Sequence, residues 1–242
     1  MMTLKLAGLR VRIAPGSEAL RAFCRDYITA EPGSADIEVR VSAEEIRRRR
    51  ADGPSLYPDD AAAERALVCA RIADALPEFD AFLLHAAAVA VDGQAYAFAA
   101  RSGVGKSTHI AYWRQVLGER MRVINGDKPI CRFTAEGRLT VFGSPWRGKE
   151  GWGENICAPL RALCLVERGA ENEVIPLPAD RVPRELFDQL HWAGLGAEGW
   201  LRTLRLTERL AQGVPLWRLR CRNDVSAAEN AIQILTEGGD EE

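Results

Sequence analysis

The chain has 242 residues, 47% of them hydrophobic, and its 32 Lys and Arg against 34 Asp and Glu give a formal net charge of −2. The hydrophobic fraction is too high for a disordered chain and supports one or two folded domains. The near-neutral charge excludes the strongly basic surface typical of nucleic-acid-binding proteins, so we expect no nucleic-acid partner.

The chain also lacks the features of a secreted or membrane protein. Residues 1–14 alternate apolar and charged side chains, unlike the apolar segment of a signal peptide. The uncharged stretch 81–91 is too short to span a bilayer, so we expect no membrane partner. Six scattered cysteines form no CxxC pair, which argues against a zinc site and indicates reduced core residues. We therefore expect a cytoplasmic protein.

Residues 1–58 are predicted to form a small N-terminal α/β unit. The apolar pattern predicts a strand over 5–13, a helix over 17–28 and a second strand over 37–41. Ser42 is a predicted N-cap, and Glu45 at the third helical position completes a capping box. The Gly- and Pro-containing stretch 52–60 is predicted to be a loop, so we place a domain boundary there.

Residues 59–242 are predicted to form one larger α/β domain with a mixed sheet. Helical spacing covers 61–76, and two apolar runs, 84–91 and 95–99, are separated by Asp92-Gly93, a strong hairpin signal. Further strands are predicted over 122–124, 129–133, 139–142, 160–167 and 214–219, and further helices over 106–117 and 226–235.

A glycine-containing loop at residues 100–107 follows one predicted strand and opens a predicted helix. This is the context of a phosphate-binding P-loop, in which backbone N–H groups and a helix N-terminus surround phosphate oxygens. Ala100 stands where the usual pattern has its first glycine. The expected nucleotide-binding residues are Ser102, Gly103, Val104, Gly105, Lys106, Ser107 and Thr108. Lys106 would reach the β- and γ-phosphates, and the Ser107 hydroxyl would ligate Mg²⁺.

Two further features are candidates for chemistry. Asp127 follows a short strand and could hold the metal with Ser107, although Asn125-Gly126-Asp127 is also a common turn sequence. The glycine-rich loop 143–155 carries Arg147 and Lys149, which could neutralise a transferring phosphoryl group, and Trp146 and Trp152, which could stack on a base. A surface loop with packed tryptophans is the alternative.

From the residues alone, all three histidines, His85, His109 and His191, are expected to be structural. A resemblance to a known family makes His85 a candidate active-site residue. The run 85–94, the loop 102–107 and the segment 125–128 resemble the catalytic domain of the HPr kinase/phosphorylase family, which shares its P-loop fold with nucleotide-dependent phosphoenolpyruvate carboxykinases. Segment 144–151 resembles short HPr-kinase-like proteins, some found beside peptide-modification genes. The resemblance covers roughly residues 80–170.

The resemblance implies an α/β P-loop kinase core of the HPr kinase/phosphoenolpyruvate carboxykinase type with a mixed sheet. It implies that His85 belongs to the active site and that Asp127 serves as base and metal anchor. The family's acidic pair aligns with Gly126-Asp127, so only its second carboxylate is present. No copy of the family's glycine-rich signature for the reverse reaction is evident, and the N-terminal unit is too short for its regulatory domain. Related kinases form oligomers, so a homo-oligomer is implied without a defined stoichiometry.

The sequence thus predicts an ATP- and Mg²⁺-dependent phosphotransferase. The expected acceptor is a hydroxyl, either a Ser of a protein or peptide or a small hydroxylated metabolite. Asp127, His85, Arg147 and Lys149 are the expected catalytic residues. Two alternatives stay open, a nucleotide-dependent binding or switch module without transfer, and a carboxykinase-like enzyme, whose metal site three histidines hardly supply.

Overall fold

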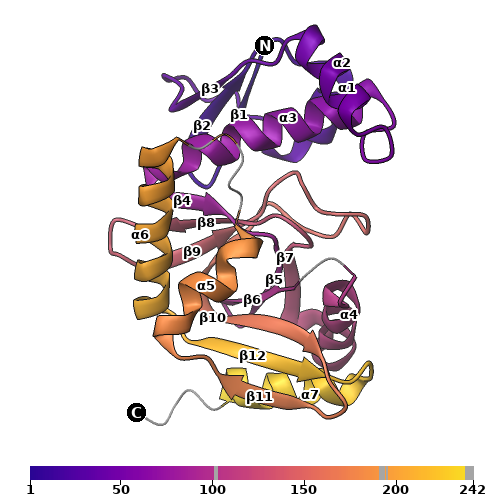
Figure 1. The fold of residues 1–242 in the computed structure, drawn as a ribbon, viewed down its shortest axis with the longest axis vertical. Coiled ribbons are helices and arrows are strands. Elements are labelled where there is room, and N and C mark those ends of the chain that lie inside the picture. Colours follow the sequence, from indigo (N-terminus) through magenta and orange to yellow (C-terminus); the bar gives the residue numbers. More distant parts are fainter. Residues whose placement is uncertain (101–102, 191–193, 195, 238–242) are drawn as a thin grey trace.

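A computed structural model of the chain describes residues 1–100, 103–190, 194 and 196–237. It is a mixed α/β structure, as expected, with a small N-terminal sheet beside a larger mixed sheet that carries helices on both faces (Figure 1). Among the described helices, none is both long and apolar enough to cross a membrane.

The N-terminal sheet has the strand order β1-β2-β3, formed by Met2–Leu6, Leu9–Ile13 and Ile37–Val39. The single strand expected over 5–13 is in fact an antiparallel hairpin. Ala7 and Gly8 turn the chain with φ angles of 49° and 78°. Alanine rarely adopts a positive φ, so Ala7-Gly8 is a weak turn signal. The buried apolar positions change there from even numbers (Leu4, Leu6) to odd numbers (Leu9, Val11), as a turn requires.

Three helices pack on or beside this sheet, α1 (Glu18–Phe23), α2 (Ala43–Asp52) and α3 (Asp60–Ala75). The predicted capping box is confirmed, because Ser42 and Glu45 each bond the other's backbone N–H. The helix expected over 17–28 ends at Phe23, and a 3₁₀ turn, η1 (Arg25–Tyr27), follows. The buried side chains of α3 share one apolar cluster with the N-terminal strands.

The larger sheet has the order β4-β8-β9-β10-β6-β5-β7, and β12 and β11 extend it beyond β10. The first half of β10 pairs with β9, while its second half lies between β6 and β12. One strand therefore joins an antiparallel part to a mixed part, in which only the pairs β6/β10 and β10/β12 of the described strands are parallel. The bounds are β4 Ala81–Leu83, β5 Ala86–Val91, β6 Gln94–Ala99, β7 Met121–Asn125, β8 Ile130–Phe133, β9 Leu139–Phe142, β10 Cys157–Arg168, β11 Glu173–Pro176 and β12 Leu216–Cys221.

The hairpin predicted from Asp92-Gly93 is confirmed. It joins β5 to β6, and both turn residues have positive φ, 48° and 81°. The strand expected over 84–91 is shorter than predicted, because β4 ends at Leu83 and β5 begins at Ala86. His85 therefore lies between two strands. Its N–H donates to the carbonyl oxygen of Gln189 (2.7 Å) instead of to a neighbouring strand.

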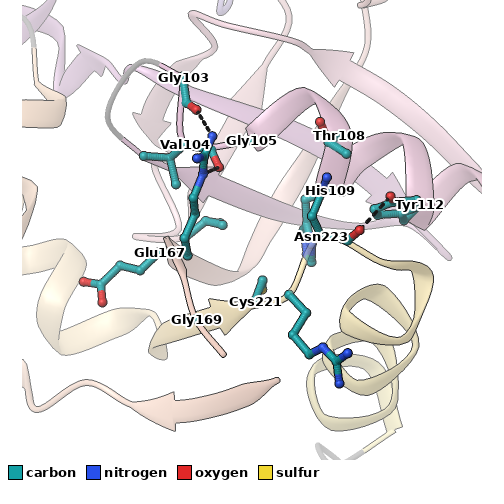
Figure 2. Close-up of a pocket in the computed structure, with 13 residues that line it drawn as sticks. Gly103, Val104, Gly105, Thr108, His109, Tyr112, Glu167, Gly169, Cys221 and Asn223 are labelled. Atoms are coloured by element: carbon teal, nitrogen blue, oxygen red, sulfur yellow. Dashed lines mark hydrogen bonds between the residues drawn. The ribbon is translucent and has the colours of Figure 1, made fainter. Parts of the chain in front are cut away.

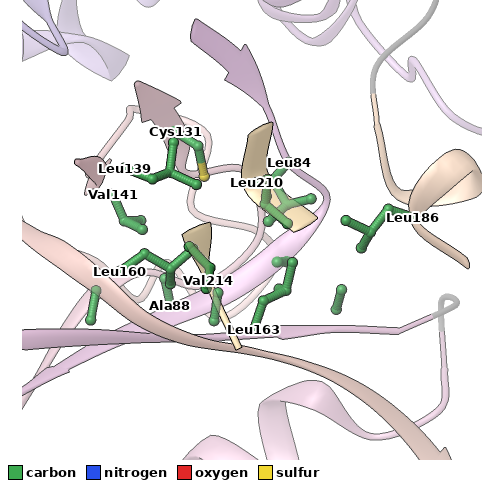
Figure 3. Packing of buried hydrophobic residues seen from close by; sticks show 14 of the residues in the cluster. Leu84, Ala88, Cys131, Leu139, Val141, Leu160, Leu163, Leu186, Leu210 and Val214 are labelled. Carbon is green, nitrogen blue, oxygen red and sulfur yellow. The ribbon is translucent and has the colours of Figure 1, made fainter. Parts of the chain in front are cut away.

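Different helices cover the two faces of the larger sheet (Figure 1). Helices α4 (Lys106–Leu117) and α7 (Val225–Ile232) pack against one face. Helices α5 (Val182–Leu186) and α6 (Ala197–Gly213) cover the other. Figure 3 shows Leu84, Leu186 and Leu210 within that second cluster. The two apolar clusters hold the helices on the two faces of the sheet. They thereby also hold in place the edge at which the parallel strands end.

Candidate active site

Several strands of the larger sheet end at the same edge. Strand β5 is antiparallel to both β6 and β7, so those two run in the same direction, and β6, β10 and β12 are mutually parallel. The carboxyl ends of these strands and the amino end of β5 therefore meet. In α/β sheets this is the edge at which ligands bind.

The glycine-containing loop leaves β6 at this edge and enters α4, in the predicted strand–loop–helix order. Gly103 and Gly105 have φ angles of +81° and +122°, which other residues rarely adopt. Gly105 is the N-cap of α4, and no side chain caps the helix. No N-cap side chain therefore accepts from the first N–H groups of α4, and these groups could donate to a bound anion. Ser102 lies outside the described residues.

Lys106 is half-buried at the start of α4 and turns its side chain back toward the loop. Its Nζ donates to the carbonyl oxygen of Ala100 (2.8 Å) and lies 3.4 Å from Nε2 of His85. Burial lowers the pKa of the Lys106 ammonium, while the nearby Asp127 carboxylate acts in the opposite direction. Lys106 and His85 are thus brought together, although one opens a helix and the other precedes a strand.

Asp127 completes this cluster from the end of β7. Its Oδ1 lies 3.4 Å from His85 Nε2, and its Oδ2 accepts from the ammonium of Lys128. Burial alone would raise the pKa of Asp127, but the hydrogen bonds and positive charge contributed by His85 and Lys128 outweigh it. The pKa is lowered to about 2. The carboxylate is therefore ionised at any physiological pH.

His85 Nε2 lies between a group that only donates and a group that only accepts. A neutral imidazole with its proton on Nε2 donates to Asp127, and the other tautomer accepts from Lys106. Both contacts are at 3.4 Å, so the geometry favours neither tautomer.

Asn125 holds the Asp127 turn in place. It is fully buried, and its Oδ1 accepts from the backbone N–H of Asp127 (2.8 Å) and of Lys128 (2.7 Å). Its Nδ2 donates to the carbonyl oxygen (3.0 Å) and hydroxyl (3.1 Å) of Ser144. Asn125-Gly126-Asp127 is therefore a turn that also presents the Asp127 carboxylate to His85 and Lys128, so a turn and a candidate site residue are compatible here.

The loop 143–155 lies against the same turn. The N–H of Gly126 donates to the carbonyl oxygen of Trp152 (2.9 Å). A Cβ added at Gly126 would stand 2.8 Å from the carbonyl oxygen of Arg147, and one added at Gly148 would stand 3.0 Å from Cβ of Asp127. The backbone approach at Gly126 is closer than a Cβ allows, and the φ of +76° at Gly148 favours glycine there. The structure therefore places this loop beside the carboxylate.

The arginine, lysine and tryptophan side chains of this loop contact different parts of the structure. Arg147 donates to the Asp26 carboxylate of the N-terminal unit (2.7 Å) and lies over the Tyr27 ring. Trp146 is buried in the same apolar cluster as the N-terminal strands. Lys149 is exposed, and Trp152 is partly buried under the guanidinium of Arg114. The structure does not bring Arg147 to Lys106 and Asp127, so its role at a phosphoryl group stays a prediction.

A magnesium ion would have to depend on few protein ligands. Within the described ranges, no three His, Cys, Asp or Glu side chains gather to hold a metal. Magnesium takes oxygen ligands and keeps several waters, so one carboxylate and one hydroxyl beside phosphate oxygens suffice. The ionised Asp127 and the partly exposed Ser107 supply that chemistry, and Thr108 offers an exposed hydroxyl next to it.

Two cavities flank the glycine loop. One, of about 400 Å³, opens on the α4 side of the sheet, and Figure 2 shows Gly103, Thr108, Tyr112, Cys221 and Asn223 around it. The other, of about 760 Å³, lies on the opposite face. Its lining residues come from the ends of β6 and β10 and from the α5 region, namely Ala99, Ala100, Val104, Leu165–Arg168, Arg184, Glu185, Asp188 and Gln189.

His109 does not join the cluster. His109 is buried in α4, where its Nε2 accepts from the indole N–H of Trp113 (3.0 Å), and burial lowers its pKa to about 4. It is therefore a neutral core residue, as expected. His191 lies outside the described residues.

Comparisons with known proteins give little further guidance. No protein-family model matches the chain, and no curated protein matches its sequence. Among solved structures, an HPr(Ser) kinase/phosphatase from Coxiella burnetii matches 54% of this chain and 92% of its own, with 9% identity and a TM-score of 0.28. A score this low indicates at most a distant fold relationship. The function must therefore be inferred from the side-chain geometry.

Proposed function

We propose that the protein is an ATP-dependent kinase that transfers the γ-phosphoryl group to a hydroxyl. The observation that carries the proposal is the meeting of Lys106, His85 and Asp127 beside a glycine loop at the start of a helix. Phosphoryl transfer needs little covalent chemistry from the protein, and its catalysis is mainly positioning and electrostatics. A cation, a carboxylate and oriented N–H groups in one place match that requirement.

The phosphates would occupy the loop and the N-terminus of α4. The expected donors are the N–H groups of the loop, within the range 102–108, and the Lys106 ammonium. When the nucleotide binds, this ammonium would leave the carbonyl oxygen of Ala100 and donate to the β- and γ-phosphates. Ser107 and Asp127 would hold Mg²⁺, which neutralises charge that develops on the phosphate oxygens. The nucleoside would extend into the cavity between α4 and the ends of β10 and β12.

Asp127 would orient the acceptor hydroxyl and take its proton. In the transfer step the hydroxyl oxygen bonds to the γ-phosphorus, the bond to the bridging oxygen of ADP breaks, and the proton passes to the carboxylate. With a pKa of about 2, Asp127 is a weak base, so its main contribution is to position the hydroxyl in a loose transition state. His85, in contact with the same carboxylate, would assist the proton transfer.

The acceptor would approach beside the loop 143–155, which lies against Asp127. It is a Ser of a protein or peptide or a small hydroxylated metabolite. Lys149 is exposed on this loop and could neutralise the moving phosphoryl group. Arg147 could do the same only after leaving Asp26.

A nucleotide-dependent binding or switch module is the second candidate. It is favoured by one observation, that both oxygens of Asp127 already have cationic or imidazole partners, Lys128 and His85. In such a module the cluster would bind nucleotide and couple it to the loop 143–155 without transfer.

A labelled-phosphate assay separates the two candidates. The protein is incubated with γ-labelled ATP and Mg²⁺, together with lysate of the source organism or a pool of hydroxylated metabolites. Label in an acceptor supports the kinase. Tight ATP binding without a labelled acceptor favours the module, and no ATP binding contradicts both.

A further inference from the structure

Arg168, the last residue of β10, reaches the glycine loop from the neighbouring strand. Its Nη2 donates to the carbonyl oxygen of Gly103 (2.9 Å), and its Nε donates to that of Val104 (3.3 Å). The dashed line at Gly103 in Figure 2 marks the first of these bonds. Strand β10 is parallel to β6, with Leu165 beside Ala99, so the chain beyond each strand emerges at the same edge. The contact therefore follows from the sheet register.

The two hydrogen bonds fix the direction of two peptide groups. In a planar trans peptide the carbonyl oxygen and the N–H of the next residue point in opposite directions. A guanidinium that holds the carbonyls of Gly103 and Val104 on its own side turns the N–H groups of Val104 and Gly105 away from itself. Both glycines have positive φ and lack side chains that would resist other orientations, so the loop needs such a restraint.

We propose that Arg168 is a positioning residue that pre-orients the loop N–H groups for the phosphates of the nucleotide; this inference rests on the proposed function. Arg168 lines both cavities that flank the loop, so it stands between the expected nucleoside side and the opposite face. The planar guanidinium donates to two acceptors in a fixed geometry. A lysine ammonium could also contact both carbonyl oxygens, but its side chain is more flexible. Pre-orientation strengthens binding because the loop does not have to be ordered when the ligand arrives.

The role can be separated from a contribution to stability, because Arg168 is exposed. The variants are Arg168→Ala and Arg168→Lys, with Arg120→Ala as the matched control. Arg120 is also exposed, and it pairs with Asp92 in the β5–β6 turn at the opposite edge of the sheet. For each variant, binding of Mg²⁺-pyrophosphate and Mg²⁺-ADP is measured by titration calorimetry, amide exchange is measured over residues 103–107, and unfolding is measured in urea.

We expect Arg168→Ala to bind both phosphate ligands about tenfold more weakly, because the loop must then be ordered as the ligand binds. Amide exchange should rise in 103–107 alone, the urea midpoint should stay unchanged, and Arg168→Lys should recover part of the affinity. If transfer activity is found, KM for ATP should rise more than kcat falls, because the interaction is present before the reaction.

The outcomes distinguish this inference from the function on which it rests. Unchanged binding and unchanged amide exchange in Arg168→Ala, with a wild type that binds ADP, would overturn the role of Arg168 and leave the kinase proposal standing. An equal loss of affinity in Arg120→Ala would also overturn it. A wild type that binds neither pyrophosphate nor ADP would contradict both the proposed function and the positioning role.

Discussion

Nε2 of His85 lies 3.4 Å from Oδ1 of Asp127, at the edge where β5 begins and β7 ends. The contact joins two segments that the sheet places side by side through the pairing of β5 with β7. Lys106 approaches the same imidazole nitrogen from α4. The cluster thus combines three elements, and its chemistry depends on the charge of Asp127.

That charge makes a measurable contribution to stability. The pKa of Asp127 is lowered from 3.8 to about 2 in the folded protein, so the ionised form favours folding. The contribution is complete above about pH 4 and is lost as the pH falls toward 2, and its size is about 2 kcal/mol. Urea unfolding of the wild type and of Asp127→Asn at pH 7 and pH 3 should show a stability difference that narrows at pH 3.

A control for this prediction is Asp52→Asn, at the exposed end of α2. The free energy of unfolding of Asp52→Asn should differ little from that of the wild type at both pH values, because solvent screens an exposed carboxylate. If the difference between wild type and Asp127→Asn is as large at pH 3 as at pH 7, the lowered pKa of Asp127 is wrong.

Asn125 is expected to be essential for the position of Asp127. Asn125→Ala leaves the N–H groups of Asp127 and Lys128 and the carbonyl oxygen of Ser144 without this partner in a buried place. We expect a loss of about 2–4 kcal/mol in the free energy of unfolding, because buried polar groups without partners are costly. Urea unfolding measures this, with Ser144→Ala as the milder comparison. A midpoint for Asn125→Ala equal to that of the wild type would refute the role.

The contact of Arg147 with Asp26 gives a test of what Arg147 does. If the pair holds the loop 143–155 on the N-terminal unit, Arg147→Ala and Asp26→Ala should lower transfer by a similar factor, and the double variant should lose no more than either. That is the non-additivity expected of two residues in contact. We expect this result from the 2.7 Å hydrogen bond between them. A further loss when Arg147→Ala is made in the Asp26→Ala protein would instead assign Arg147 a role at the phosphoryl group.

Local features of the sequence predicted much of the fold. The helix over 106–117 and the Asp92-Gly93 hairpin are where the pattern placed them, because helical spacing and turn chemistry depend on neighbouring residues. The central strands were also predicted, although β10 (Cys157–Arg168) is longer than expected. Its two halves pair with different strands, and pairing between distant segments leaves no local pattern.

The sequence did not predict the contacts of the site that depend on backbone groups or on residues far apart in the chain. Arg168 belongs to no motif, since its partners are carbonyl oxygens of another segment. Asn125 has the sequence context of an ordinary turn residue, and its burial and side-chain hydrogen bonds show that it fixes the turn that carries Asp127. The hydrogen bond between Arg147 and Asp26 joins residues far apart in the sequence, and no spacing rule connects them.

The most direct test of the kinase proposal measures two quantities in Asp127→Asn, the rate of transfer from γ-labelled ATP and the affinity for Mg²⁺-ADP. We expect transfer to fall by about a thousandfold, because the variant loses the group that orients the acceptor hydroxyl and takes its proton, while ADP affinity falls only a fewfold. Lys106→Ala is the comparison, and it should lose both, because its ammonium would contact the phosphates directly. Transfer that survives in Asp127→Asn, or ADP affinity that is unaltered in Lys106→Ala, would contradict the assignment of this cluster as a phosphoryl-transfer site.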